Sequence, residues 1–271
     1  MGDNEMEKIK TKKLFALLNI AGFIVTVIFN ALANALPLNG KDTGELSDAY
    51  PNLFVPAGLT FSIWGLIYLL LAGFVVYQII MAFRTDGDSG FMEKIGPWFL
   101  ISSAANTLWI IAWHWEQVLL SVLIMLALLA SLIIIYVRIN SGNDRPKPAE
   151  YLFVRLPFSV YLGWITVAPI ANITALLVNA DWNRFGLGEQ FWTVFVLAAA
   201  VLITLLVLIT RKDTAYALVI IWAFSGILIK RRAYTVPADT AVETAALIGI
   251  ILLGAAVIYT ANRKIPALSR K

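Results

Sequence analysis

The sequence has no cysteine and a single histidine, His114, and only 14% of its 271 residues carry a charge. Without cysteine, the chain holds no disulfide, thiol nucleophile or Cys-ligated zinc or iron–sulfur centre. A single histidine also excludes a multi-histidine metal site within the chain. Soluble domains are about 25% charged, so the shortage of charge excludes an ordinary soluble protein, whose surface must be hydrated.

Hydrophobic residues are abundant instead and make up 60% of the chain. Several apolar runs exceed the roughly 18 uncharged residues with which a helix crosses a bilayer. The sequence therefore predicts an all-α, polytopic membrane helix bundle. The breaks between the runs predict eight helices, over residues 14–36, 57–83, 96–114, 117–137, 152–178, 190–210, 214–230 and 240–261. The third and fourth are separated by so few residues that we expect a tight helical hairpin.

Basic residues report topology, because cytoplasmic loops carry an excess of Lys and Arg. When the loops are assigned alternately, sixteen of the 21 Lys and Arg residues fall on the side of the N-terminus. We therefore expect both chain termini in the cytoplasm, with residues 1–13 as a cytoplasmic segment and the first apolar run as a retained anchor. The Lys230-Arg231-Arg232 cluster opposes this rule. Either its loop is an exception, or the seventh predicted helix does not fully cross.

No ionisable side chain lies near the middle of any predicted span. Such side chains usually mark proton relays and ion pathways, so their absence counts against a proton-coupled pump. The sequence also lacks the phosphate-loop GxxxxGK, the zinc-protease HExxH and the hydrolase GxSxG motifs. Because the basic residues flank apolar segments as topology signals, we expect no nucleic-acid partner, and we expect no metal site.

The spans contain Trp, Tyr and Asn at helical spacing. Residues three, four or seven apart share one face of a helix, and three predicted spans carry such a stripe. The residues are Trp64 and Tyr68 in the second span, Asn106, Trp109 and Trp113 in the third, and Tyr161, Trp164, Ala168 and Asn172 in the fifth. Indole and amide donors that face a bundle interior need partners, from neighbouring helices or from a ligand. These nine residues form the candidate ligand site.

A simpler interpretation is that Trp and Tyr anchor the helices at the membrane interface, and that Asn forms only interhelical hydrogen bonds. It fits the four tryptophans close to span ends, Trp98, Trp115, Trp182 and Trp192. It fits Trp64 and Trp164 poorly, because they lie roughly 10 and 18 Å inside their spans at 1.5 Å per residue. Both interpretations stay open on the stripes alone.

Three stretches match the signatures of one known family in the right order. The stretch from Val55 to Tyr68 places Pro56 eight residues before Trp64. Residues 106–109 read Asn-Thr-Leu-Trp, and residues 161–172 contain the pattern Tyr-x-x-Trp-x-x-x-Ala-x-x-x-Asn. These stretches resemble the second, third and fifth helices of the TspO/MBR family, the tryptophan-rich sensory proteins related to the mitochondrial translocator protein. The resemblance covers about residues 10–178. It implies a five-helix TspO-like domain over 14–178 and a three-helix C-terminal extension over 179–271.

The resemblance also implies a function. TspO-like proteins are implicated in binding porphyrins, haem and other hydrophobic ligands, with suggested roles in tetrapyrrole transport or breakdown and in stress sensing. Trp64 and Trp164 match the pocket tryptophans of the family, and a flat macrocycle would stack on their indole faces. We therefore expect a tetrapyrrole or sterol-like ligand, no required cofactor, a homodimer as one assembly, and a multi-pass location in the plasma membrane.

Two further features are weaker candidates. His114 stands at the tip of the predicted hairpin, where we expect a hydrated interfacial histidine rather than an axial haem ligand. The Lys230-Arg231-Arg232 cluster offers a partner for a ligand propionate, although a charged loop is the simpler interpretation.

Three other functions stay open. A permease for a small neutral solute is supported by the number of spans and by Gly and Pro inside predicted helices. An enzyme acting on a lipid or tetrapyrrole is the second, and without acid–base residues inside the membrane it would need photochemistry, radicals or the loop carboxylates Asp42, Glu45 and Asp48; enzymatic activity is therefore not our main expectation. A structural or assembly subunit is the third.

Overall fold

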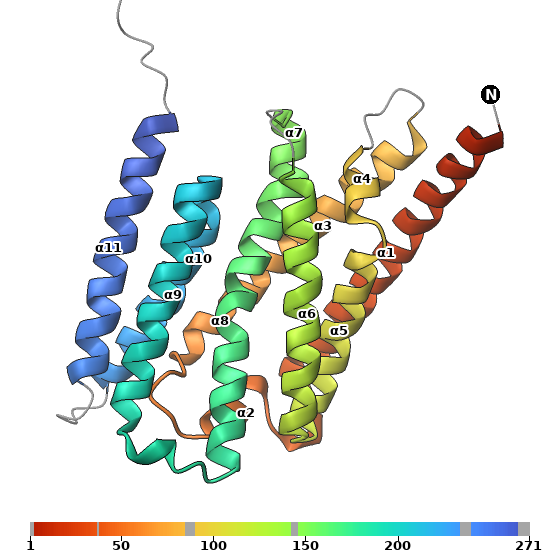
Figure 1. The fold of residues 1–271 in the computed structure, drawn as a ribbon. Helices are drawn as coiled ribbons and strands as arrows, with labels where there is room; N and C mark the ends of the chain where they lie inside the picture. Colours follow the sequence, from red (N-terminus) through yellow and green to blue (C-terminus); the bar gives the residue numbers. More distant parts are fainter. Residues whose placement is uncertain (1–2, 37, 85–89, 142–145, 234–239, 265–271) are drawn as a thin grey trace, which may run out of the picture. The chain divides into compact units, whose positions relative to one another are not determined.

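The computed structural model of the protein describes residues 3–36, 38–84, 90–141, 146–233 and 240–264. Over these ranges the chain is helical and contains no strand (Figure 1). The long helices are α1 (Asp3–Ala35), α3 (Ile63–Phe83), α5 (Trp98–His114), α6 (Val118–Ile139), α8 (Leu156–Asn179), α9 (Glu189–Arg211), α10 (Thr214–Ala233) and α11 (Thr240–Lys264). They coincide with the apolar segments of the sequence, which confirms the prediction of an all-α membrane protein.

Short helical turns connect the long helices. They are η1 (Leu38–Gly40), α2 (Thr43–Asp48), η2 (Gly58–Ser62), α4 (Gly90–Ile95), α7 (Pro148–Glu150), the π-helical turn η3 (Tyr151–Arg155) and η4 (Arg184–Gly186). Two of them, η1 and η4, contain a residue outside helical geometry, Asn39 and Phe185 respectively.

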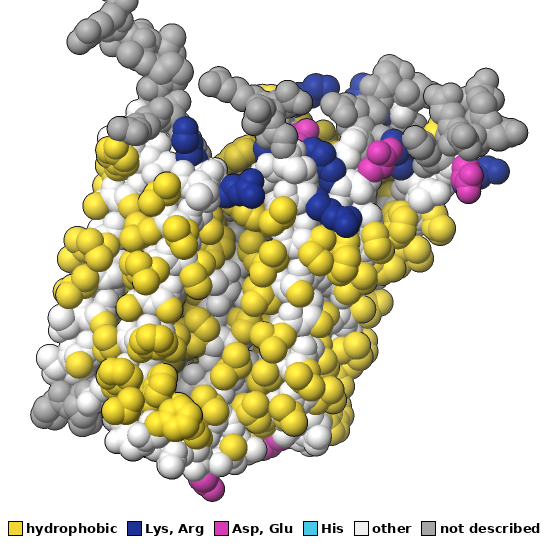
Figure 2. Space-filling model, in the orientation of Figure 1, with side chains coloured by type: hydrophobic (Ala, Val, Ile, Leu, Met, Phe, Trp, Pro, Cys, Tyr) yellow, Lys and Arg dark blue, Asp and Glu magenta, His cyan; other side chains and the backbone are white. Residues whose placement is uncertain are grey.

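Among the described residues, seven helical stretches are long and apolar enough to cross a membrane: Ile9–Ala35, Gly58–Phe83, Val118–Ile139, Pro148–Asn179, Glu189–Arg211, Thr214–Ala233 and Thr240–Asn262. Helix α5 has 17 residues, which is about 26 Å of helix against a hydrocarbon core of about 30 Å. The count of eight spans and the cytoplasmic location of the termini therefore stay predictions. Figure 2 shows hydrophobic side chains along the sides of the helices, with Lys and Arg side chains gathered toward helix ends.

The chain packs into two compact units. The first comprises Met1–Leu46 and Ile63–Leu162, and the second comprises Ser47–Ser62 and Gly163–Lys271. This packing boundary falls inside α8, whereas the sequence places the end of the TspO-like domain at residue 178. The two divisions rest on different criteria, and the division into a five-helix domain and an extension stays a prediction.

In the first unit, α1 packs against α3 and α5, and α5 pairs with α6. The turn between α5 and α6 is the tight hairpin expected from the sequence, closed by a hydrogen bond of 2.9 Å from the Gln117 N–H to the Ala112 carbonyl. Phe74 of α3 meets Phe99 of α5 and Phe158 of α8, with ring centroids 5.0 and 4.9 Å apart. These rings fill the space between three helices.

In the second unit, α9, α10 and α11 pack side by side (Figure 1). The second part of α8 approaches α10 closely at Gly163, where a Cβ atom would lie 3.0 Å from the Val219 side chain. Beside it, the Tyr216 hydroxyl of α10 donates a hydrogen bond of 2.9 Å to Thr166. A small residue therefore allows α8 and α10 to touch, and a hydrogen bond sets their register.

Residues 57–62, here called the strap, bind across α10 in the same unit. The Ala57 N–H donates to the Gly226 carbonyl at 3.0 Å, and the Trp222 indole N–H donates to the Thr60 carbonyl at 2.9 Å. The Thr60 side chain lies directly over Gly226. A Cβ atom at residue 226 would lie 1.9 Å from Thr60 Oγ1 and 2.8 Å from Thr60 Cβ.

Gly226→Ala is therefore expected to destabilise the protein by about 1–3 kcal/mol, as over-packing of an interior does. Rotation of the threonine side chain cannot relieve the contact, because its Cβ atom is itself too close. The measurement is thermal or denaturant unfolding of the purified protein. Gly254→Ala in α11 is the matched control, because a Cβ atom there meets no heavy atom within 4 Å. Equal stability of the two variants would contradict the packing of the strap.

Candidate ligand site

Aromatic side chains from three helices meet around Trp64 in the first unit. Its ring stacks on Tyr68 and on Trp109, with centroids 5.6 and 6.3 Å apart, and it meets Tyr161 edge-on at 6.0 Å. Trp113 extends the cluster by stacking on Trp109 at 6.5 Å. The predicted stripes of α3, α5 and α8 thus form one aromatic surface, which we call the aromatic cluster (Trp64, Tyr68, Trp109, Trp113 and Tyr161).

A chain of hydrogen bonds holds the cluster in place. Asn30 of α1 donates through Nδ2 to Asn106 Oδ1 at 2.7 Å. Asn106 of α5 donates in turn through its Nδ2 to the Tyr161 hydroxyl at 2.8 Å. All three side chains are buried. Asn30 Nδ2 also donates to the Thr26 carbonyl of its own helix at 2.9 Å. Because buried polar groups in a bilayer need partners within the protein, the hydrogen bonds between Asn30, Asn106 and Tyr161 hold α1, α5 and the start of α8 in register.

One polar atom in this region is left over. The Tyr68 hydroxyl is buried and has no hydrogen-bond partner among the described residues. Its ring is held by the stack on Trp64, with an interplanar angle of 21°. A buried hydroxyl without a partner costs free energy, about 1–3 kcal/mol in protein interiors. Such a group is therefore a donor suited to an acceptor that comes from outside the chain.

The stripe on α1 escaped the sequence analysis. Thr26 of this helix bonds through Oγ1 to the Ser103 carbonyl at 3.0 Å, and Asn19 donates to Gln78 at 3.1 Å. With Asn30, these residues are spaced seven and four apart and so share one face of the helix. That spacing was the available signal. The residues that carry this spacing are uncharged and polar, and they match none of the three family signatures.

The remaining predicted site residues belong to the second unit. Trp164 is buried there and meets Phe61 of the strap edge-on, with ring centroids 6.0 Å apart. Asn172 is buried and Ala168 is partly exposed on the same helix. The structure thus brings together Trp64, Tyr68, Asn106, Trp109, Trp113 and Tyr161 within the first unit, whereas Trp164, Ala168 and Asn172 belong to the second.

His114 differs from expectation. The sequence predicts a hydrated interfacial histidine, but the side chain is fully buried. Its Nδ1 lies 2.8 Å from the Ile110 carbonyl, and its own carbonyl accepts a hydrogen bond of 3.0 Å from Asn39. Residues of the η1–α2 segment cover the hairpin tip, where Lys41 also pairs with Glu116 at 2.9 Å. This cover removes His114 from water.

The Lys230-Arg231-Arg232 cluster is largely neutralised. Lys230 pairs with Asp48, and Arg232 lies 3.8 Å from a carboxylate oxygen of Glu243. Arg231 is buried. Two of the three charges are thus matched by acidic residues of the same unit. Because these charges are paired, the cluster is a weaker indicator of topology and a weaker candidate for binding a ligand propionate.

Within the described ranges, no group of three or more His, Asp or Glu side chains is arranged to hold a metal ion. Compared with known protein families, the chain matches one family model, described as TSPO-like protein, over residues 16–259. The match includes α9, α10 and most of α11, which lie beyond the last sequence motif at Asn172. No curated protein and no solved structure matches the chain.

Asn106→Leu is expected to destabilise the protein by about 1–2 kcal/mol, because it keeps the volume but leaves Asn30 and Tyr161 without their shared partner. Reversible unfolding in detergent measures this change. Asn34→Leu is the control, since Asn34 is exposed on α1 and bonds only to the Asn30 carbonyl of its own helix, at 2.8 Å. An Asn106→Leu protein as stable as the control would show that the chain of hydrogen bonds does not hold the unit together.

Proposed function

The chain belongs to the TSPO-like family of membrane proteins, and from this membership we propose that the aromatic cluster binds a flat, hydrophobic ligand of the porphyrin type, for transport or sensing. One observation carries the proposal. Trp64 contacts three other aromatic rings, and beside it stands the buried Tyr68 hydroxyl, which has no partner among the described residues. The cluster thus offers stacking faces together with a donor.

Ring stacking is expected to contribute much of the binding affinity, because such a ligand reaches the site from the bilayer rather than from water. A hydrophobic macrocycle is already dissolved in the bilayer, so leaving water supplies no further driving force, just as it supplies none between membrane helices. Affinity then depends on close packing and on hydrogen bonds. Ring pairs contribute about 0.5–1.5 kcal/mol each beyond burial. The rings of Trp64, Tyr68 and Trp109 are nearly parallel, with interplanar angles of 21° and 27°, which suits a planar ligand.

The hydrogen-bonding groups suit a ligand with an acceptor. Asn30, Asn106 and Tyr161 are bonded to one another, so we assign them chiefly to shaping the site. The Tyr68 hydroxyl has no hydrogen-bond partner among the described residues, so it is available as a donor. An imine-type nitrogen of a porphyrin, a carboxylate or a sterol hydroxyl would each accept a hydrogen bond from it. Selectivity between a tetrapyrrole and a sterol-like ligand would then come from ring stacking, which favours the flat aromatic molecule.

Other parts of the proposal rest on family resemblance alone. Trp164, Ala168 and Asn172 are candidate ligand contacts in the second unit on that basis. The same holds for a plasma-membrane location and a homodimer. The apolar helices support an integral membrane protein, and haem or porphyrin is proposed as a ligand rather than as a resident cofactor.

A second function is favoured by the polar face of α1. The pairs Asn19–Gln78, Thr26–Thr107 and Asn30–Asn106 place uncharged hydrogen-bonding groups one after another inside the first unit. Such a series suits a permease for a small neutral solute. Each of these side chains is paired with another, however, whereas the aromatic cluster has a donor left over, so we place ligand binding first.

Trp64→Ala is expected to weaken binding of protoporphyrin IX at least about tenfold, because it removes the central ring of a buried cluster. The titration is followed by the absorbance of the porphyrin in lipid nanodiscs, so that loss of one tryptophan does not alter the signal. Trp98→Ala is the matched control, because Trp98 lies outside the aromatic cluster. The Arg138 guanidinium carbon lies 5.9 Å from the centroid of the Trp98 ring.

Equal affinities of the Trp64→Ala and Trp98→Ala proteins would contradict the proposed site. Flux of a neutral solute through proteoliposomes that is insensitive to protoporphyrin would instead support the permease.

A further inference from the structure

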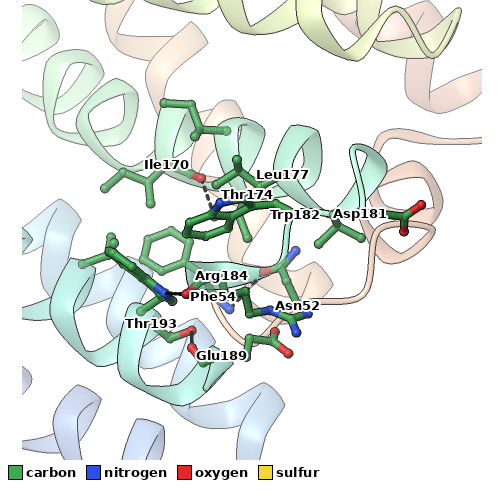
Figure 3. Close-up of a pocket in the computed structure, with 14 residues that line it drawn as sticks. Asn52, Phe54, Ile170, Thr174, Leu177, Asp181, Trp182, Arg184, Glu189 and Thr193 are labelled. Carbon is green, nitrogen blue, oxygen red and sulfur yellow. Dashed lines mark hydrogen bonds between the residues drawn. The ribbon is translucent and has the colours of Figure 1, made fainter. Parts of the chain in front are cut away.

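The second unit contains a pocket of about 550 Å³ that lies outside the aromatic cluster (Figure 3). It is bounded by the second half of α8, the start of α9, the loop between them and residues 52–54. Its volume falls within the range of about 300–1,000 Å³ that is usual for small-molecule sites. Most of its lining is apolar, with Phe54, Ile170, Leu177, Trp182 and Trp192 among the lining residues.

The pocket lies on the face of α8 opposite to the predicted stripe of Tyr161, Trp164, Ala168 and Asn172. Ile170 comes nine residues after Tyr161, which at about 100° per residue is half a revolution around the helix. Thr174 and Leu177 follow Ile170 at helical spacing and also line the pocket. The stripe that contains Tyr161, Trp164 and Ala168 therefore points away from it.

The loop from residue 181 to 185 is held in a costly conformation. Asp181, Arg184 and Phe185 have φ angles of 49°, 56° and 53°, in the left-handed region that residues with side chains rarely adopt. Contacts maintain this shape: the Trp192 indole N–H donates to the Arg184 carbonyl at 3.0 Å, and the rings of Trp182 and Trp192 lie 5.3 Å apart. The tryptophans predicted as interface anchors thus fix Arg184 at the pocket.

Most polar side chains of the lining are already engaged. Glu189 accepts the Leu53 N–H at 2.7 Å, and Asn52 accepts the N–H groups of Phe54 and Val55 at 3.0 and 2.9 Å. Thr174 and Thr193 donate to carbonyls of their own helices. Figure 3 shows the Asp181 carboxylate directed away from the other lining side chains.

Arg184 is different, since it forms no ion pair with any described residue. The first turn of α9 lies beside it, and this turn carries Glu189, whose negative charge offsets the positive end of the helix dipole. Figure 3 places Arg184 with Glu189 on one side of the pocket, across from Ile170 and Leu177. The pocket therefore has an apolar end and a polar end, where the exposed Arg184 guanidinium has no ion-pair partner among the described residues and the Glu189 carboxylate accepts the Leu53 N–H.

We propose that this pocket binds an amphiphile with one anionic head group, a carboxylate or a phosphate, which pairs with Arg184 while the hydrocarbon chain lies against α8. A planar guanidinium forms two parallel hydrogen bonds with either group. Trp192 acts as a positioning residue through its bond to the Arg184 carbonyl. This site is independent of the function proposed for the aromatic cluster.

The test measures binding of radiolabelled dodecanoate, dodecyl phosphate, dodecanol and dodecyltrimethylammonium to the full chain in nanodiscs, with subtraction of binding to empty nanodiscs. The two anions should bind at least about tenfold more tightly than dodecanol, as expected for a hydrogen bond to a charged group. The tighter anion identifies carboxylate or phosphate as the natural head group. Arg184→Gln should reduce both anions to the level of dodecanol, and Arg184→Lys should restore part of the difference.

Arg211→Gln is the matched control, because Arg211 is an exposed basic residue at the other end of α9. It should leave all four affinities unchanged, and so should Trp64→Ala, which separates this proposal from that on the aromatic cluster. If Arg184→Gln unfolds, Val196→Trp, which fills the pocket, should abolish binding of the anions. Equal binding of dodecanol and dodecanoate, tighter binding of the cation, or anion binding that survives Val196→Trp would each overturn the proposal.

Discussion

Water is absent from the interior of a bilayer, and the hydrogen-bond chain Asn30–Asn106–Tyr161 meets this constraint in the first unit. Apolar packing alone sets no unique register between membrane helices, because lipid tails are as apolar as leucine. Three buried polar groups that need one another as hydrogen-bond partners do set this register, since other arrangements leave unpaired donors in hydrocarbon. The aromatic cluster follows from that register: once Tyr161 is fixed by Asn106, its ring meets Trp64, and Trp64 stacks on Tyr68 and Trp109.

The second unit is held together differently. Its strap lies so close to α10 that only glycine fits at residue 226, and the basic end of α10 is matched by Asp48 and Glu243. The chain thus assigns its aromatic residues to two tasks. Those of the first unit form a stacking surface with an unused hydroxyl, while Trp182 and Trp192 hold a strained loop that carries an arginine to a pocket.

Helical spacing predicted which residues of α3, α5 and α8 meet in the first unit. Residues three or four apart share one face of a helix whatever packs beside it. The role of Asn30 could not be read in the same way, since it depends on which helix packs beside α5. The burial of His114 depends on a connecting segment that folds over the hairpin tip, and the pairing of Lys230 joins residues far apart in the sequence. The pocket beside Arg184 combines residues 52–54 with α8 and α9, a juxtaposition that no single segment encodes. Trp182 and Trp192 are at span ends as predicted, yet they also line this pocket.

The proposed function requires that the Tyr68 hydroxyl serve a ligand rather than the fold. Tyr68→Phe keeps the ring that stacks on Trp64 and removes only the buried, unpartnered hydroxyl. The most direct measurement pairs two quantities on this one variant, the free energy of unfolding without ligand and the dissociation constant for protoporphyrin IX. The free energy of unfolding should stay unchanged or rise, because an unsatisfied polar group is lost, while the affinity for protoporphyrin IX should fall by about twofold to tenfold, which corresponds to one hydrogen bond. A variant that is less stable but binds as tightly as before would contradict the proposed function.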